Sequence, residues 1–420
     1  MTAGGSRKRT LPRVNSARPF SDADLAFVRS NFPALNDSWV YADNAGGSVP
    51  ARGVTARVTD YMSRLGVQLY ATHERSEEAT RLFYAGHAAA ARLLGADEEE
   101  VYLGASSAAN VRLLARALRP MFAAGDEIVV TDLDHESNIG PWRELAESGA
   151  TIREWKFDRE SHELTIAGLD AVLRPRTKLV CFTYVSNIVG VVHDAAAFVK
   201  RIHAAGALAC IDGVAFAPHR RVDVRAIGAD FYFVSLYKVF GPHLGAMYGR
   251  RDLLRRAKSQ NHFFISEEAV PNKFEPGGVP HELVASIPGI LEYFEQLDAR
   301  LGPGPAQIDR VFDAIARHED ALTAPLLDFL RSRKGVGILG RPDADRVPTL
   351  AFTVDGRDAS TIPPLLDAGN VAIRYGDFYA RRAVNALGIG ERNGVVRASL
   401  LHYNTPAEVA RLVAALERAV

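Results

Sequence analysis

Between residues 100 and 250, short apolar runs alternate with segments whose apolar residues recur every three or four positions. The runs are rich in Val, Ile, Phe and Tyr, and several are apolar at every position, as in strands covered by helices on both faces. Asn110–Leu118 is typical of the helical segments, because its apolar residues form one stripe. The pattern predicts an α/β protein with a mostly parallel sheet. The predicted strands are Val101–Leu103, Glu127–Thr131, Thr151–Trp155, Lys178–Val185, Ala207–Ile211, Phe231–Val234 and Ala246–Tyr248.

The pattern changes after Gly302–Pro305. A long helical stretch is followed by two strand candidates, Thr349–Val354 and Val371–Arg374, and then by a last helix that begins at a capping box around Thr405. Near the other end of the chain, Ser21 is a candidate N-cap. We therefore expect a smaller α+β domain formed by residues 21–37 and 303–420, a large domain formed by residues 38–302, and a flexible tail at residues 1–20.

Composition narrows the classes of function. The 420 residues include 50 Lys and Arg against 50 Asp and Glu, and 47% are hydrophobic. A chain of this apolar content forms a core, and its zero net charge argues against a general nucleic-acid binder, which needs a basic excess. No apolar run nears the roughly 20 residues that span a bilayer, and no Cys/His cluster has zinc-ligand spacing. We expect no nucleic-acid, membrane or metal partner, and a reducing, cytoplasmic location.

Polar residues follow the predicted strands at their ends, where open α/β sheets bind ligands. The first strand leads into Gly104–Asn110, a loop of small residues and serines at a helix N-terminus, where backbone N–H groups could hold an anion. The second strand is followed by His135, which could stack on an aromatic ligand or transfer protons. Taken alone, the first segment is a weak signal because serines also cap helices with nothing bound, and an ordinary surface turn is the better explanation of the second.

Two charged residues are harder to explain as surface groups. Asp212 ends a strand, where a carboxylate needs a cation or hydrogen-bond donors. Lys238 lies just beyond the strand Phe231–Val234, where partial burial would lower its pKa and make it a better nucleophile toward an aldehyde. Helix capping and a lysine that reaches out to solvent are the simpler alternatives. Together, however, the lysine, the aspartate, the histidine and the helix N-terminus are the parts that hold pyridoxal 5′-phosphate.

Longer motifs carry a more specific signal. They are Tyr41-Ala42-Asp43-Asn44-Ala45, Asp134-His135-Glu136-Ser137-Asn138-Ile139, Val185-Ser186-Asn187-Ile188-Val189-Gly190, Ile211-Asp212-Gly213, Ala229-Asp230-Phe231-Tyr232-Phe233-Val234-Ser235 and Arg397-Ala398-Ser399-Leu400-Leu401-His402-Tyr403-Asn404-Thr405. From about residue 38 to 418 the chain resembles the class V aminotransferase group of fold-type-I pyridoxal-phosphate enzymes, in particular its cysteine desulfurase and selenocysteine lyase branch. The resemblance implies a seven-stranded, mostly parallel sheet in the large domain, and a homodimer.

The resemblance also implies roles for individual residues. Lys238 would be the Schiff-base lysine, Asp212 the partner of the pyridine nitrogen and His135 the residue that stacks on the ring. Arg397, assisted by Arg374, would bind the α-carboxylate of the substrate, for which a bidentate guanidinium is well suited. The remaining expected cofactor contacts are Ala105, Ser106, Asn187, Ser235, Tyr237 and Gly278, with Ser106 and Ser235 at the phosphate and Asn187 close to the substrate as well.

Departures from the family pattern bear on the reaction. Where desulfurases of this branch carry a nucleophilic cysteine, this chain has Tyr379, and its only cysteines, Cys181 and Cys210, lie inside predicted strands. The usual His before the lysine is Tyr237, the usual Gln after Asp-Gly-Ala is Ala215, and the Thr-Pro of the neighbouring subunit's loop becomes Gly278-Val279. The binding site is retained, while the chemistry around it differs.

We therefore expect a pyridoxal-phosphate enzyme that acts at the α-carbon of an amino acid. The leading hypothesis is a C–S lyase that carries out β-elimination on a cysteine-type substrate and needs no enzyme thiol. An aminotransferase or an amino-acid epimerase is the alternative, and a non-catalytic binding protein that keeps the fold is a third class.

Overall fold

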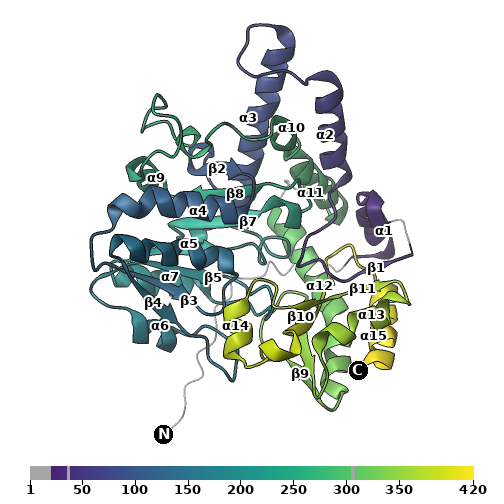
Figure 1. The fold of residues 1–420 in the computed structure, drawn as a ribbon. Helices are drawn as coiled ribbons and strands as arrows, with labels where there is room; N and C mark the ends of the chain where they lie inside the picture. Colours follow the sequence, from purple (N-terminus) through teal and green to yellow (C-terminus); the bar gives the residue numbers. More distant parts are fainter. Residues whose placement is uncertain (1–19, 36–37, 304–307) are drawn as a thin grey trace.

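The computed structural model describes residues 20–35, 38–303 and 308–420. The predicted tail at residues 1–20 therefore lies outside the described residues, apart from Phe20. A large sheet occupies one half of the molecule and a smaller sheet the other (Figure 1). The expected boundaries of the two domains, at residues 37/38 and 302/303, remain a prediction.

The large sheet has seven strands in the order β2-β8-β7-β6-β5-β3-β4. Only β8 runs antiparallel to its neighbours, so the sheet is mostly parallel, as predicted. The predicted strands are all present, two of them with the same bounds. The strands are β2 (Val101–Gly104), β3 (Glu127–Thr131), β4 (Thr151–Trp155), β5 (Thr177–Thr183), β6 (Leu208–Asp212), β7 (Phe231–Ser235) and β8 (Gly245–Gly249).

Alternate side chains of these strands enter two separate apolar layers. On β5 and β6, Cys181 and Cys210 face one layer, which is closed by α4 (Ser107–Leu118), α5 (Gly140–Arg143) and α9 (Arg251–Arg256). Val180 and Ile211 face the other, which contains the remaining large-domain helices. Both cysteines are fully buried and free. Further helices are α2 (Arg52–Arg64), α3 (Glu74–Leu94), α6 (Ile166–Val172), α7 (Ala195–Ala204), α8 (Val224–Ile227), α10 (His281–Val284) and α11 (Pro288–Leu301).

The smaller sheet is antiparallel, in the order β12-β13-β10-β9. Its strands are β9 (Val336–Ile338), β10 (Thr349–Val354), β12 (Arg374–Gly376) and β13 (Val395–Ser399). The helices of this half are α12 (Ile308–Ser332), α13 (Pro363–Asp367), α14 (Arg381–Ala386) and α15 (Pro406–Ala419), and the first helix of the chain is α1 (Asp22–Ser30). Capping boxes begin α1 at Ser21 and α15 at Thr405, as predicted.

The predicted strand Val371–Arg374 is two strands, which is a correction to the sequence analysis. Its first part, β11 (Val371–Ala372), pairs in parallel with β1 (Val40–Tyr41), whereas β12 pairs with β13. The chain changes partner at Ile373, and a run of apolar residues does not reveal such a change. The sequence analysis also missed β1, β9 and β13. Arg29 of α1 bonds to the Tyr403 carbonyl and to Glu408, so the first helix contacts the last.

Two segments project from the large-domain half (Figure 1). One is the hairpin of α2 and α3, and the other is the irregular stretch of residues 258–280. The base of this stretch is fastened by Lys273, whose fully buried ammonium donates hydrogen bonds to the carbonyls of Arg255, Ala257 and Glu267, at 3.0, 2.6 and 2.7 Å. Among the described residues, no helix is long and apolar enough to cross a bilayer.

Replacing Lys273 with Met should loosen residues 258–280 without unfolding the sheet. Three carbonyls would lose their donor, among them the buried carbonyl of Ala257, and leaving a buried group unsatisfied costs about 1–3 kcal/mol. Local opening should therefore become roughly tenfold more frequent. The rate of limited chymotrypsin digestion at the exposed Phe263 and Phe264 measures the frequency of this opening. Lys258→Met, at an exposed neighbouring position, should leave the cleavage rate unchanged. Equal cleavage of the two variants would contradict the anchoring role.

Candidate active site

The ends of five strands of the large sheet open into one cavity of about 540 Å³, its mouth included. Binding pockets for small ligands have this size. Of the residues predicted to form the site, seven line the cavity: Ser106, His135, Asn187, Asp212, Ser235, Tyr237 and Lys238. They come from loops far apart in the sequence, which the strand order brings to one edge of the sheet. Other lining residues, among them Ser107, Ser137, Thr183 and Val214, were not singled out in the sequence.

Lys238 and Asp212 lie deep in this cavity. Burial, together with the charge of the nearby Arg397, lowers the pKa of Lys238 to about 8, against the opposing effects of Asp212 and Asp43. Burial also raises the pKa of Asp212 to about 6, against a hydrogen bond from the Val214 N–H, at 2.9 Å, and the charge of Lys238. Within the described part of the chain, the Lys238 amine makes no hydrogen bond or ion pair. The amine and one oxygen of the carboxylate are therefore available to a ligand.

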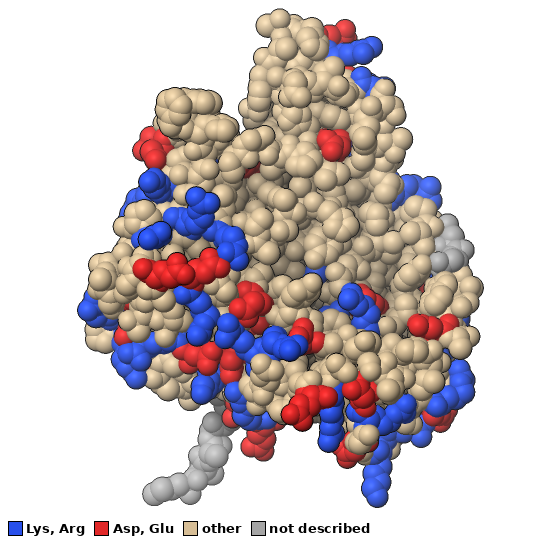
Figure 2. Space-filling view, in the orientation of Figure 1, with Lys and Arg blue, Asp and Glu red and all other residues tan. Residues whose placement is uncertain are grey.

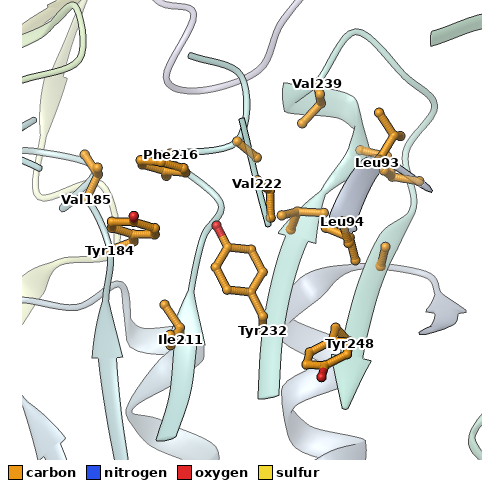
Figure 3. Packing of buried hydrophobic residues seen from close by; sticks show 14 of the residues in the cluster. Leu93, Leu94, Tyr184, Val185, Ile211, Phe216, Val222, Tyr232, Val239 and Tyr248 are labelled. Carbon is orange, nitrogen blue, oxygen red and sulfur yellow. The ribbon is translucent and has the colours of Figure 1, made fainter. Parts of the chain in front are cut away.

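The turn after Asp212 is shaped by aromatic side chains. Tyr184 and Phe216 stack with their rings 3.8 Å apart beside the end of β6, and the Tyr232 hydroxyl points toward the segment that follows this strand (Figure 3). A Cβ added at Gly213 would lie 2.0 Å from that hydroxyl, so glycine is required immediately after Asp212. The aromatic cluster therefore fixes the position of the aspartate.

His135 is held as a neutral ring. Its Nδ1 accepts a hydrogen bond from the Ser137 N–H at 3.1 Å, which leaves the proton on Nε2. Burial, followed by the charges of Lys238 and Arg397, lowers the pKa of His135 to about 4. The preceding Asp134 is buried and accepts hydrogen bonds from Asn138 and from the Thr183 N–H, which ties the His135 loop to β5. A flat, uncharged ring thus borders the cavity.

A serine cluster lies at the N-terminus of α4. The Ser106 side chain caps this helix, and the Ser107 and Ser235 hydroxyls are 2.8 Å apart. Facing them, Gly245 of β8 leaves no room for a side chain, because an added Cβ would lie 2.4 Å from the Ser106 backbone. Hydroxyl groups and free N–H groups at a helix N-terminus form an anion site.

Arg397 and Arg374, on the smaller sheet, are not among the residues that line the cavity, but Arg397 contacts Asn187, which lines it. Its side chain is 2% exposed, and it donates to the Asn187 carbonyl at 3.1 Å and to Asp43 at 3.0 Å. The Phe378 ring covers one face of the guanidinium at 3.7 Å. Arg374, paired opposite Arg397 in the sheet, is exposed and lies 3.4 Å from the other oxygen of Asp43. Asp43 belongs to a motif that the sequence analysis noted without assigning a role to this residue.

Tyr379 lies over the His135 ring, with the ring centres 5.2 Å apart. Both Tyr379 and Phe378 have left-handed backbones, with φ of 60° and 50°, which is strained for aromatic residues. The strain is offset by hydrogen bonds from the Asn187 amide to the Phe378 carbonyl and from the Glu136 N–H to the Tyr379 carbonyl, both 2.8 Å, and by the ion pair of Glu136 with Arg382. The segment 377–380 therefore forms a fixed wall beside the cavity.

Two predicted cofactor contacts do not line the cavity. Ala105 is exposed beside the serine cluster, and Gly278 is an exposed residue of the projecting stretch 258–280. The expected role of Gly278 depends on a second subunit, so the position of this residue in one chain does not test it. Within the described ranges, no cluster of three or more His, Cys, Asp or Glu side chains could hold a metal ion.

Comparisons with known proteins agree with this architecture. The family model for class-V aminotransferases matches residues 40–412. The aminotransferase-like protein FGM3 of Gibberella zeae is 38% identical over 94% of this chain and 98% of its own length. A probable cysteine desulfurase of Streptomyces coelicolor is 30% identical over 94% of this chain and 96% of its own. The crystal structure of the cysteine desulfurase CsdA of Escherichia coli superposes with a TM-score of 0.81 at 26% identity, covering 94% of this chain and 98% of CsdA.

The fold and these relatives define a pyridoxal-phosphate-dependent enzyme with fold-type-I architecture. The chain belongs to the class-V aminotransferase family and to its cysteine desulfurase branch.

Proposed function

We propose that the cavity holds pyridoxal phosphate and that the enzyme acts at the α-carbon of an amino acid. The observation that carries the proposal is the amine of Lys238, which has a lowered pKa and no hydrogen-bond partner among the described residues, in one cavity with Asp212. The donor set fits the cofactor: Ser106, Ser107 and Ser235 at the N-terminus of α4 suit a dianionic phosphate.

The other polar groups fit the remaining parts of the cofactor. Asp212 would pair with the pyridine nitrogen and keep it protonated, and the neutral His135 ring would stack on the pyridine face. The Asn187 amide oxygen is buried and unpartnered, so it has a free acceptor for a donor on the ligand. When bound, pyridoxal phosphate supplies an aldehyde that captures amines and a ring that stabilises negative charge at the α-carbon.

The protein residues would divide the reaction between them. Arg397 would hold the substrate α-carboxylate at the junction of the two sheets, and Lys238, as a free amine, would take the proton from the α-carbon and later return it. A base with a pKa near 8 is well matched to this task at neutral pH.

The geometry supports a C–S lyase that works without an enzyme thiol. Cys181 and Cys210 are free but fully buried in the sheet and are not among the residues that line the cavity, and Tyr379 lies beside His135. In β-elimination the α-proton goes to Lys238 and the Cβ–S bond breaks with its electron pair on sulfur. The protonated Lys238 then gives this proton to the sulfur, which leaves as a thiol or, from cystine, as a persulfide. The released 2-aminoacrylate hydrolyses to pyruvate and ammonia, so no sulfur acceptor on the protein is needed.

Incubation of the holoenzyme with L-cysteine, L-cystine and S-methyl-L-cysteine should yield pyruvate and ammonia in equal amounts from at least one of them. Lys238→Ala should abolish both products because the proton acceptor is lost. The double variant with Cys181→Ala and Cys210→Ala should keep at least half of the wild-type kcat, which would exclude a persulfide on the enzyme.

No pyruvate from any of these substrates would refute the C–S lyase. Conversion of the cofactor to its pyridoxamine form by amino donors would instead identify an aminotransferase. Deuterium incorporation at the α-carbon with an intact side chain would identify an epimerase. Retention of cofactor absorbance and of cellular function in Lys238→Ala would identify a non-catalytic binding protein.

The lowered pKa of Lys238 predicts how the apoenzyme captures pyridoxal phosphate. Only the neutral amine attacks an aldehyde, so the rate should rise about tenfold between pH 7 and pH 9 and level off above the pKa, whereas an ordinary lysine would keep gaining rate up to about pH 10. Stopped-flow absorbance measures the rate, and borohydride reduction with peptide mapping identifies the modified residue. A rate still rising steeply above pH 9, or a label on another lysine, would contradict the assignment.

We also propose that the enzyme is a homodimer. The two projecting segments carry exposed apolar side chains, among them Tyr70, Tyr84, Phe263 and Phe264. Between these segments the molecular surface is hollowed and nearly free of charged side chains (Figure 2). A surface of this kind is typical of a protein–protein interface. The expected cytoplasmic location remains a prediction.

Sedimentation should give a mass of about twice 45.7 kDa. Replacing both Phe263 and Phe264 with Ala should raise the dimer dissociation constant at least tenfold, because exposed aromatic anchors contribute strongly to interfaces. Ile166→Ala, at an exposed apolar position on α6, serves as the control. A monomeric wild-type protein at micromolar concentration would contradict the dimer.

A further inference from the structure

Arg397 is a buried cation that already has an anionic partner. Its side chain is 2% exposed, and the only carboxylate within ion-pair distance among the described residues is that of Asp43, at 3.0 Å from Nη2. A guanidinium this deeply buried is costly without a counter-ion. Asp43 therefore stabilises the fold by neutralising Arg397 when no substrate is bound.

The other approaches to this guanidinium are closed. Phe378 covers one face at 3.7 Å, Nη1 donates to the Asn187 carbonyl, and Nε is buried without a partner. A bidentate carboxylate needs two neighbouring N–H groups on one edge of the guanidinium. A guanidinium presents such pairs at Nε with Nη2 and at Nη1 with Nη2, and Asp43 engages Nη2, which both pairs share. A substrate carboxylate thus competes with Asp43 for the same cation.

Arg374 offers Asp43 a second partner. Its Nη1 is 3.4 Å from Oδ2 of Asp43, while Arg397 holds Oδ1. Arg374 and Arg397 are opposite each other across β12 and β13, so the two guanidinium groups flank one carboxylate. Gly46 leaves space there, because a Cβ at this position would lie 3.2 Å from Oδ2 of Asp43 and 3.4 Å from Nη1 of Arg374.

We propose that Asp43 is a resting counter-ion that a substrate carboxylate displaces from Arg397, and that Arg374 holds the displaced Asp43. The inference rests on the proposed binding of the substrate carboxylate by Arg397. Asp43 is a positioning residue in this scheme, because it acts through Arg397. The exchange replaces one negative charge by another, so Arg397 and the nearby Lys238 experience a similar field with and without substrate.

The exchange predicts that substitutions of Asp43 and of Arg374 change the affinity for a carboxylate ligand in opposite directions. Asp43→Asn removes the competing charge, so the binding of a carboxylate ligand should tighten roughly fivefold. Arg374→Gln leaves Asp43 with Arg397 as its only partner, so binding should weaken by a similar factor. In the double variant Asp43→Asn/Arg374→Gln there is no displaced carboxylate for residue 374 to hold, so its affinity for the carboxylate ligand should equal that of Asp43→Asn alone. If Arg374 instead bound the ligand directly, the two effects would add.

Titration of the holoenzymes with L-alanine and with L-alaninamide, followed by cofactor absorbance, tests the proposal. Alaninamide lacks the carboxylate, so its dissociation constant should be unchanged in all variants. Arg381→Gln removes another exposed cation, paired with Asp377 rather than Asp43, and should leave alanine binding unchanged. Asp43→Ser replaces Asp43→Asn if the latter does not fold.

Unchanged or weaker alanine binding by the Asp43 variants would overturn the exchange, as would additive effects in the double variant. A wild-type enzyme that does not bind alanine more tightly than alaninamide would overturn the proposed role of Arg397 itself, and the exchange with it. The two failures are distinct, because the second already shows in the wild-type enzyme.

Discussion

The site depends on keeping two cations, Lys238 and Arg397, largely out of water while each remains within reach of a carboxylate. Burial lowers the pKa values of both, Lys238 to about 8 and Arg397 to about 10, and Asp212 and Asp43 oppose the shift. A cation without such a partner would destabilise the fold by several kcal/mol. The positions of these four charges therefore constrain every element that carries them.

Each of the two sheets carries part of this set of charged residues. The large sheet places Lys238 and Asp212 at the ends of neighbouring strands, with Gly213 held against Tyr232, whereas the smaller sheet places Arg397 inside β13. Neither sheet alone forms the site. Asn187 connects them, because its carbonyl accepts from Arg397 and its amide donates to the Phe378 carbonyl. A small movement of one half relative to the other would change the separation of Lys238, the proposed proton acceptor, from Arg397, the proposed carboxylate-binding group.

Sequence patterns predicted the large sheet well because most of its strands are buried along their length and keep the same neighbours. Glu127–Thr131 and Thr151–Trp155 have the predicted bounds, although Thr151–Trp155, at the edge of the sheet, is partly exposed. The smaller sheet was harder to predict: the strand at Val371 changes partner after two residues, and Val336–Ile338 is short and partly exposed. Seven predicted site residues line the cavity, because they follow strands whose ends meet at one edge of the sheet.

Asp43 and segment 377–380 show what a linear pattern leaves out. Asp43 meets Arg397 because β1 lies beside β11 and because Asp43, just after β1, forms a bridge with Ser399 at the end of β13. The left-handed backbones of Phe378 and Tyr379 run against the preferences of both residues and persist through contacts made with Asn187, Glu136 and Arg397. The local sequence does not predict such strain, because residues from other parts of the chain maintain it. Segment 377–380 can therefore be placed only in the assembled fold, whereas the residues at the strand ends can be placed from the sequence.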